Sequence, residues 1–354
     1  GFIATRFPSL GFKLHLDKAP SRAPAMSLLL INLAAVWSTP ATVPSVALGP
    51  NLTMPAVSLG TGEYQGNACV AAVSSAISLG YRSIDTAHEY GNQKQVGAAV
   101  RAAIAANSSL ARSDFFIITK VEGGLSPDET TKHLEADVAL LDLGSTLDLV
   151  LLHYPKAAPF KSLEATIQEQ WRAIVAFADA GNARAVGVSQ FCAACLKYLD
   201  EAGATGQHAR PRLHQFGWHV GMGRDPQGIA AVTAARGDCV AMAYSPLAEA
   251  DPAIFDGAIA AIGKAHGVES TQVALRWLWQ MELSGAQSTT HSQAHIPFAV
   301  AASNPVYQAS NLDIFGTLQL TASEMDTLSD LTKPRGCPFW QGSECYTSSN
   351  CTKV

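Results

Sequence analysis

The chain has 354 residues, of which 48% are hydrophobic and 15% are charged, and its formal net charge is -5. Without a cluster of Lys and Arg, neither a nucleic-acid surface nor a basic membrane-binding patch is expected, and no apolar run reaches the ~18 residues that predict a membrane span. The hydrophobic content also excludes a largely disordered chain.

Residues 1–43 have the character of a leader. Met26 opens the apolar segment Ser27–Trp37, which is about as long as the hydrophobic region of a signal peptide, and the small residues Ser38–Thr42 follow it. We therefore expect translation to start at Met26 and the protein to enter the secretory pathway, with residues 1–25 a presequence or a gene-model extension. The alternative is a disordered leader on a cytoplasmic protein.

Residues 44–332 form one predicted domain in which apolar strands alternate with amphipathic helices. Turn residues between short apolar pairs in Val46–Pro55 predict a hairpin that plugs the bottom of a barrel. The predicted strands are Ala56–Leu59, Tyr81–Asp85, Phe115–Lys120, Leu147–His153, Arg184–Ser189, Arg212–Phe216, Cys239–Tyr244 and Ile296–Ala302. The predicted helices include Ala68–Leu79, Gln93–Ala106, Asp128–Leu141, Leu163–Ala180 and Thr271–Met281, with Gly80, Gly144 and Gly181 as caps. Eight such units predict a closed (β/α)8 TIM barrel.

Four polar residues stand at or just after the ends of neighbouring predicted strands, where the active sites of such barrels lie. Asp85, Lys120 and His153 end three of these strands, and Tyr90 follows Asp85 in its loop. A buried Lys ammonium held by a carboxylate is expected to lower the pKa of a nearby phenol, so that Tyr90 could donate a proton. Each residue alone has an ordinary structural role as an alternative.

These residues lie in motifs through which the chain resembles the aldo-keto reductase family. Gly80–Gln93, Leu151–Pro155 and Ala243–Leu247 match the family's signatures of strands two, four and seven. Ile117–Lys120 and Ala185–Ser189 extend the likeness, which runs from about Val46 to Leu331. The resemblance implies reduction of aldehydes or ketones by hydride transfer from NADPH, with Tyr90 as proton donor and His153 orienting the carbonyl. It also implies a substrate site of Tyr90, His153 and Tyr154, and a cofactor site of Thr61, Asp85, Ser189, Gln190, Gln215, Tyr244, Ser245, Leu247, Ser303 and Asn304.

The chain departs from the family pattern at several positions. Gln190 replaces the usual Asn after Ser189, Gly62 stands where many members have Trp, and the short segment 155–162 predicts an open pocket. No Lys or Arg occurs between Arg276 and Lys333, so the usual cations for the 2′-phosphate of NADPH are absent: Phe298 or Ala302 takes the place of the Lys, depending on the alignment. NAD is therefore possible alongside NADP.

Residues 333–354 form an irregular tail that contains Cys337, Cys345 and Cys351, for which we expect disulfides in an oxidising compartment. Cys192 and Cys195 have the spacing of a metal-binding pair, but they lack a second pair, so we interpret them as a helix start and expect no metal site. Asn51, Asn107 and Asn350 stand in glycosylation sequons.

The partner implied is a small-molecule carbonyl substrate, and we expect a monomer. One alternative function is a non-catalytic nucleotide-binding barrel that regulates a partner protein, which the missing phosphate-binding cations favour and the intact set of four polar residues opposes. Another is a lyase that uses Lys120 as a Schiff-base amine, for which Asp85 and Tyr90 have no obvious need. A Rossmann fold is disfavoured, because Gln65 stands where its fingerprint needs glycine.

Overall fold

The computed structural model describes residues 42–248, 251–283, 295–331 and 337–346. The chain divides into two units, 1–38 and 39–354, and all described residues belong to the second. Eight parallel strands close into a barrel in the order β10-β3-β4-β5-β6-β7-β8-β9, so the predicted TIM barrel is confirmed. The strands are β3 (Val57–Gly60), β4 (Ser83–Asp85), β5 (Phe116–Val121), β6 (Leu149–Leu152), β7 (Val186–Ser189), β8 (Leu213–Gly217), β9 (Val240–Tyr244) and β10 (Phe298–Val300).

The predicted hairpin is present as two antiparallel strands, β1 (Ser45–Gly49) and β2 (Leu52–Pro55). Leu48 and Met54 of this hairpin are buried in one apolar cluster with residues such as Ile118 and Met242 from the barrel strands. The hairpin thus fills one end of the barrel with side chains, which leaves the carboxyl ends of the strands as the open face.

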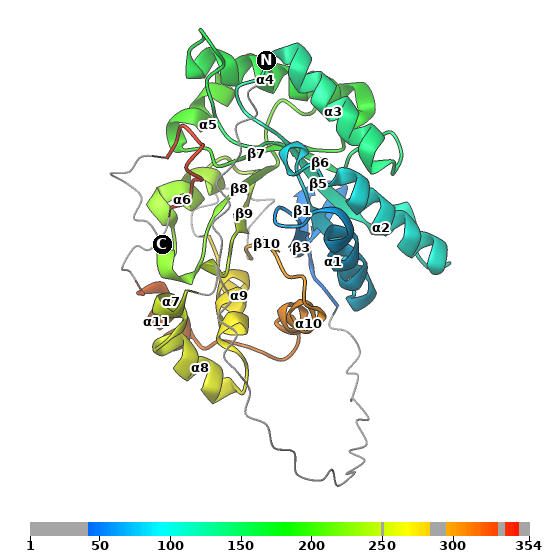
Figure 1. Ribbon diagram of the computed structural model, residues 1–354. Coiled ribbons are helices and arrows are strands. Elements are labelled where there is room, and N and C mark those ends of the chain that lie inside the picture. The colour runs from blue at the N-terminus through cyan, green and yellow to red at the C-terminus, as the bar shows by residue number, and fades with distance from the viewer. Residues whose placement is uncertain (1–41, 249–250, 284–294, 332–336, 347–354) are drawn as a thin grey trace, which may run out of the picture. The chain divides into compact units, whose positions relative to one another are not determined.

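Helices lie outside the ring of strands (Figure 1) and pack on it through a second and larger apolar cluster. Each strand is too short to be stable alone, and burial of its outward side chains under a helix holds it in place. The helices are α1 (Gly66–Leu79), α2 (Gln93–Ala106), α3 (Pro127–Leu141), α4 (Leu163–Phe177), α5 (Ala193–Asp200), α6 (Ile229–Ala234), α7 (Pro252–Phe255), α8 (Ala258–His266), α9 (Ser270–Gln280), α10 (Pro305–Asp313) and α11 (Ala322–Ser329).

Local sequence signals explain where several helices begin and end. Ser126 caps α3 in a capping box with Glu129, and Gly80 ends α1 in a left-handed conformation, as predicted. The prediction that Gly144 caps α3 is wrong: Asp142 takes the left-handed position (φ 50°), because the helix stops at Leu141, two residues earlier than the glycine requires.

Several predicted strands are shorter than expected at their amino ends. Arg184 and Arg212, for instance, precede their strands and donate hydrogen bonds to Asp148 and Asp238, respectively.

Two of the sequon asparagines, Asn51 and Asn107, are exposed. The leader up to residue 41, the insertion at 284–294, the sequon at Asn350 and Cys351 lie outside the described residues.

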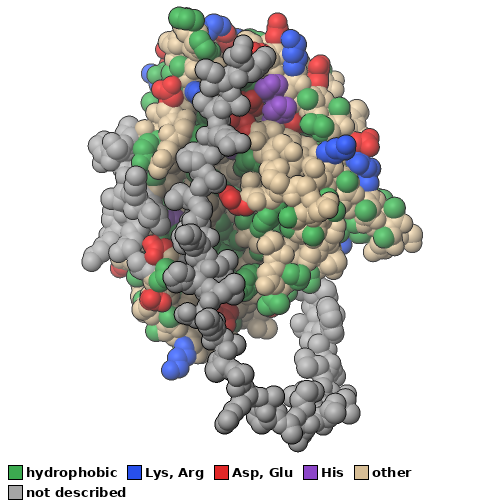
Figure 2. Space-filling view, viewed as in Figure 1, with side chains coloured by type: hydrophobic (Ala, Val, Ile, Leu, Met, Phe, Trp, Pro, Cys, Tyr) green, Lys and Arg blue, Asp and Glu red, His purple; other side chains and the backbone are tan. Residues whose placement is uncertain are grey.

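Charged side chains are few and mixed in sign on the face drawn in Figure 2, where apolar and uncharged polar groups cover most of the described surface. Within the described residues, no helix combines the length and the apolar character that crossing a membrane requires.

Candidate active site

The centre of the site is a buried ion pair between two neighbouring strands. Asp85 is the last residue of β4, and Lys120 lies near the end of β5; their side chains are 5% and 1% exposed. The Lys120 ammonium donates to Asp85 Oδ1 and to the Thr86 carbonyl, the latter at 2.9 Å. Burial lowers the pKa of Lys120, but the interactions with Asp85 and Tyr90 together outweigh burial and the net pKa is raised. Lys120 is therefore a fixed positive charge at neutral pH.

Tyr90 faces this charge. It ends η1 (His88–Tyr90), a short 3₁₀ turn that stops at Gly91, and Lys120 Nζ lies 5.1 Å from the centre of its ring. Lys120 also interacts with the phenol oxygen through a hydrogen bond. Lys120 lowers the pKa of Tyr90, as expected, but burial raises it by more, so the net pKa is raised in the protein alone. Tyr90 is thus held protonated, the state that a proton donor needs.

His153, directly after β6, completes the predicted group of four. Its ring packs against Tyr90 edge to face, with centroids 5.6 Å apart. Burial lowers the pKa of His153, although Glu89 opposes this shift with a carboxylate oxygen 3.3 Å from Nδ1. His153 is therefore a neutral imidazole at neutral pH, able to hydrogen-bond an uncharged oxygen. The structure brings together all four residues that the sequence pointed to.

Glu89 is a part of the site that sequence reasoning missed. Besides approaching His153, it accepts a hydrogen bond of 2.8 Å from the Tyr154 hydroxyl. Burial raises the pKa of Glu89, but its interactions with Tyr154, His153 and Lys156 together outweigh burial, and the net pKa is lowered. Tyr154 was predicted to contact substrate; its hydroxyl is committed to Glu89 and its ring packs at 5.2 Å from Trp340.

A second omission is Asn92, whose fully buried side chain ties the loop that carries the tyrosine to two strands. Its Nδ2 donates to the carbonyls of Thr61 (2.8 Å) and Tyr64 (3.0 Å), and its Oδ1 accepts from Thr86 (2.7 Å). Thr61, a predicted cofactor residue, uses its own hydroxyl to bond the Asp85 carbonyl at 2.9 Å. Asn92 lies within the Gly80–Gln93 motif, which was the available signal.

Two of the predicted cofactor residues, Ser189 and Gln215, differ in their hydrogen bonding. Ser189, at the end of β7, has a buried hydroxyl without a hydrogen-bond partner within the described part of the chain. Gln215 of β8 pairs with Ser189 in register, but its amide donates to Asp85 Oδ2 at 2.7 Å. A buried, unpaired hydroxyl is costly in a finished protein. Ser189 therefore fits a group that brings its own donor or acceptor, as a carboxamide does.

The C-terminal tail contacts this face near the ends of β7 and β8, and the expectation of an open pocket stays a prediction. Gln190 does not point to an open cofactor site: its side-chain oxygen accepts from the Trp340 backbone, and its carbonyl accepts from the Ser343 hydroxyl at 3.2 Å. Pro338 accepts a bond of 2.9 Å from Gly217 of β8. The short segment after Pro155 leaves the room that the tail occupies.

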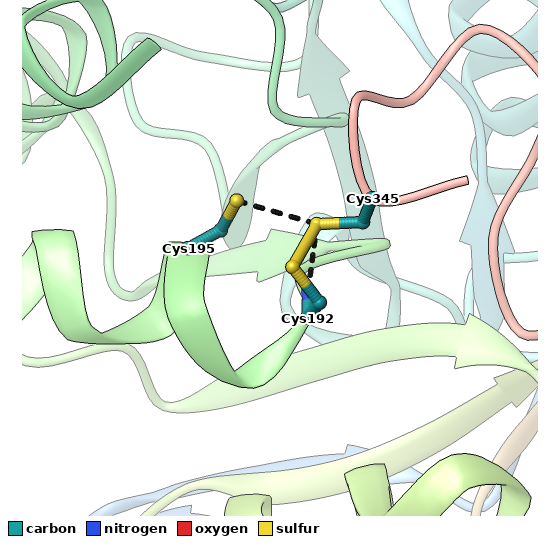
Figure 3. A group of neighbouring side chains, drawn as sticks. All are labelled: Cys192, Cys195 and Cys345. Carbon is teal, nitrogen blue, oxygen red and sulfur yellow. Dashed lines mark hydrogen bonds between the residues drawn. A yellow bond between two sulfur atoms is a disulfide. The ribbon is translucent and has the colours of Figure 1, made fainter. Parts of the chain in front are cut away.

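A disulfide fastens the tail. Cys345 is bonded to Cys192, and Cys195 lies beside the pair with its sulfur 3.3 Å from that of Cys345 (Figure 3). Cys337 is also disulfide-bonded. The expectation of disulfides in the tail is thus confirmed for these two cysteines, and Cys192 precedes α5, as its interpretation as a helix start predicted. Of the two cysteines with metal-pair spacing, Cys192 is in the disulfide and Cys195 is a neighbouring free thiol.

The remaining predicted cofactor residues line the rim formed by the ends of β9 and β10. Tyr244, the last residue of β9, is half-buried, Ser245 is exposed, and Leu247 packs on the large apolar cluster. Ser303 is exposed and hydrogen-bonds Tyr64, and Asn304 caps α10 by accepting from the Val306 amide at 2.9 Å.

Neither candidate position for the phosphate-binding Lys supplies a charge. Phe298 is fully buried and packs in the large cluster, and Ala302 is buried as well. Arg276, the last cation before the gap, is tied to Gln280 at 2.6 Å and to the Ile314 carbonyl at 2.9 Å.

Comparison with known proteins agrees with this geometry. The profile described as "Aldo/keto reductase family" matches residues 54–250. An aldo-keto reductase of Mycolicibacterium smegmatis is 31% identical over 312 residues, covering 87% of this chain and 97% of the relative. The 2,5-diketo-D-gluconic acid reductase B of a Corynebacterium species is 30% identical, covering 85% and 96%.

Morphine 6-dehydrogenase of Pseudomonas putida is 32% identical over 81% of this chain and 91% of its own. Among solved structures, an aldo/keto reductase from Brucella melitensis superposes with a TM-score of 0.68 at 27% identity, covering 83% of this chain and all of the other. The chain belongs to the aldo-keto reductase family, a family of oxidoreductases that act on carbonyl compounds.

Proposed function

We propose that the protein reduces small aldehydes or ketones to alcohols with NADPH or NADH, acting as a monomer. The observation that carries the proposal is the convergence of Asp85, Tyr90, Lys120 and His153 at the open end of the barrel, next to the unpaired Ser189 hydroxyl. Relatives named as a diketogluconate reductase and a morphine dehydrogenase support a carbonyl–alcohol reaction on a small molecule.

The nicotinamide cofactor, when bound, supplies the hydride for the carbonyl carbon. Ser189 fits its carboxamide, and Tyr244, at the same rim, offers an aromatic face for its ring. Thr61, Ser245 and Leu247 belong to the proposed cofactor site through the positions they hold at the strand ends.

Tyr90 donates the proton to the substrate oxygen. Lys120 then faces the phenolate that this step leaves, and an ammonium beside a phenolate stabilises it strongly in a buried site. Asp85 keeps Lys120 in place, and Gln215 in turn fixes Asp85 through its 2.7 Å bond. These residues provide a fixed positive field where negative charge develops.

His153 orients the carbonyl. With its one proton on Nε2, the neutral imidazole next to the Tyr90 ring donates to the same oxygen without adding a full charge to the site. Glu89, near its Nδ1, limits the rotation of the ring. Two donors on one oxygen fix the face of the carbonyl that receives the hydride.

We further propose that the protein distinguishes weakly between NADPH and NADH. Ser303 and Asn304 offer only uncharged groups near the start of α10, and hydrogen bonds to an anion from charged donors are roughly twice as strong. Each missing charged donor removes on the order of 1.5–3 kcal/mol, which corresponds to about tenfold or more in affinity for the phosphate.

The experiment is a fluorescence titration of the purified protein with each nucleotide, followed by reduction of a panel of small aldehydes. We expect both nucleotides to bind and at least one aldehyde to be reduced. Binding of a nucleotide without turnover of any carbonyl would favour a non-catalytic regulatory barrel, and binding of neither would refute the reductase.

For location we propose an oxidising compartment of the secretory pathway. The Cys192–Cys345 disulfide and the bonded state of Cys337 support this proposal. Sequencing of the amino terminus of the native protein tests it: a mature start after residue 37 is expected, and an intact segment through residue 43 would refute it.

A further inference from the structure

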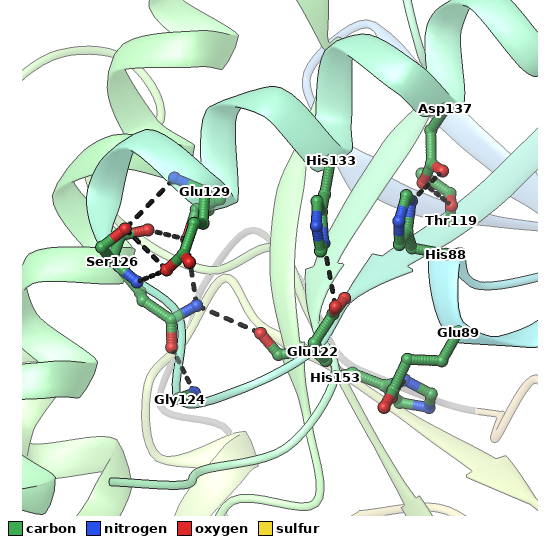
Figure 4. Close-up of polar contacts among 12 residues, drawn as sticks. His88, Glu89, Thr119, Glu122, Gly124, Ser126, Glu129, His133, Asp137 and His153 are labelled. Atoms are coloured by element: carbon green, nitrogen blue, oxygen red, sulfur yellow. Dashed lines mark hydrogen bonds and ion pairs between the residues drawn. The ribbon is translucent and has the colours of Figure 1, made fainter. Parts of the chain in front are cut away.

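A second cluster of polar side chains lies beside the active site but takes no part in the proposed chemistry (Figure 4). It consists of His88, the first residue of η1, Glu122, directly after β5, and His133 of α3. One ligand atom from each lies within 4.8 Å of the other two. Two imidazoles and a carboxylate are a frequent ligand set for zinc. We call these three residues the His–Glu–His cluster.

A buried carboxylate orients one of the two rings. Asp137 is fully buried in α3, and its Oδ1 lies 2.7 Å from His88 Nδ1. Gln93 and Thr119 donate to the same carboxylate at 2.9 and 2.7 Å, so Asp137 is held in place. With Nδ1 bonded to Asp137, the nitrogen that His88 has available is Nε2. Ligand histidines are commonly fixed in this way by a carboxylate on the other nitrogen.

Two buried polar atoms of the cluster have no hydrogen bond. Among the residues that the structure describes, Glu122 Oε2 has no hydrogen-bond partner, and His133 Nδ1 lies 2.8 Å from Glu122 Oε1 without the alignment that a hydrogen bond requires. Buried groups of this kind are rare, because each costs on the order of 1–3 kcal/mol of stability. A bound cation would satisfy both atoms at once.

From these contacts we propose that the His–Glu–His cluster binds one zinc ion through an imidazole nitrogen of each of His88 and His133 and a carboxylate oxygen of Glu122, with water as the fourth ligand. The rings of His88 and His133 are stacked with centroids 4.0 Å apart, so binding turns the His133 ring out of the stack. His133 has room for this rotation because its side chain is 31% exposed.

The ion joins three elements that meet at the active site. His88 begins the turn that ends in Tyr90, Glu122 follows the strand that carries Lys120, and His133 belongs to α3. The ion binds at the start of this turn, whereas the proton donor is its last residue, and the proposed role is structural. Zinc that binds only the folded state at a free concentration c stabilises it by RT ln(1 + c/Kd), so the melting temperature is expected to rise with the logarithm of the zinc concentration above Kd.

Calorimetric titration of chelator-treated protein with zinc chloride tests the proposal, together with thermal unfolding at the same zinc concentrations. The wild type is expected to bind one zinc with micromolar or tighter affinity, and Mg²⁺ is expected not to compete, because it prefers oxygen ligands. His133→Gln and Glu122→Gln each weaken binding at least about tenfold. Asp137→Asn weakens it 10- to 100-fold while every direct ligand is kept.

His266→Gln is the matched control, because His266 also pairs with a carboxylate, that of Glu324 at 2.9 Å, in an exposed place. Cys195→Ser controls for zinc on the thiol next to the disulfide. Co²⁺ in place of zinc is expected to give the spectrum of nitrogen and oxygen ligands without a thiolate charge-transfer band. The proposal would be overturned if the wild type does not bind zinc 1:1, or if both His133→Gln and Glu122→Gln bind it unchanged. Loss of binding in a control variant instead would also overturn it.

Discussion

Replacement of Lys120 by Met separates the two roles of the buried ion pair, stability and catalysis. The Lys120 and Asp85 side chains are almost fully buried, so Lys120→Met leaves the Asp85 carboxylate with Gln215 as its remaining side-chain donor. At a contact of ~2.8 Å and an effective dielectric constant of ~20, the lost attraction is about 6 kcal/mol before relaxation. Measured losses for breaking one side of such pairs are about 3–5 kcal/mol.

We therefore expect Lys120→Met to lower the free energy of unfolding by about 3–5 kcal/mol in urea denaturation, a large part of the 5–15 kcal/mol typical of folded domains. Tyr90→Phe, which keeps the ion pair, costs about 1 kcal/mol. Both variants lose carbonyl reduction, but only the first loses stability as well.

The double variant Asp85→Asn/Lys120→Met is expected to recover at least half of the lost stability, because no charge is left unpaired. If the single variant is as stable as the wild type, or if the two changes are simply additive, the account of Lys120 and Asp85 as a coupled buried pair is refuted.

Three further predictions concern the tail, pH and the cofactor. Cys345→Ser is expected to expose residues 337–346 to proteolysis and to lower the free energy of unfolding by about 2–4 kcal/mol. Cys195→Ser leaves the disulfide intact and serves as the control. Equal cleavage of the two variants would contradict the attachment of the tail through the Cys192–Cys345 disulfide. Burial lowers the pKa of His214 to about 3 and that of His219 to about 4, from 6.5. Between these values and 6.5 the unfolded chain binds more protons than the folded one, so the free energy of unfolding falls as pH drops below 6.5. The loss at pH 5 is about 2 kcal/mol for each of the two histidines. His214→Gln should remove about half of the total loss, measured by urea titrations at pH 7 and pH 5. Ser303→Lys adds a cation at the start of α10 and should raise the ratio of NADPH to NADH affinity about tenfold in fluorescence titrations; an unchanged ratio would place the 2′-phosphate elsewhere.

The barrel could be predicted because its strands are short apolar runs separated by helices with clear end signals such as Ser126 and Gly80. Asp85, Lys120 and His153 were predictable for the same reason. The topology of a barrel places the carboxyl ends of all strands on one face, so residues far apart in sequence meet there. Tyr90 followed from its motif.

Other features depend on contacts that no local pattern encodes. Cys192 and Cys345 are 153 positions apart, and the tail contains no periodic signal that would place it over Gln190. The net pKa of Tyr90 is set by how much burial outweighs Lys120, which depends on packing rather than on residue type. Likewise, the His–Glu–His cluster draws on a 3₁₀ turn, a loop and a helix, and its spacing matches no linear metal motif.

The most direct test of the central claim is the steady-state rate of aldehyde reduction by Tyr90→Phe, compared with the wild type at saturating nucleotide. Loss of the proton donor is expected to lower kcat by about 10²–10⁴-fold, while nucleotide affinity stays within about twofold, because the ring and its neighbours remain. A Tyr90→Phe variant that reduces aldehydes at the wild-type rate would contradict the assignment of Tyr90 and with it the proposed mechanism.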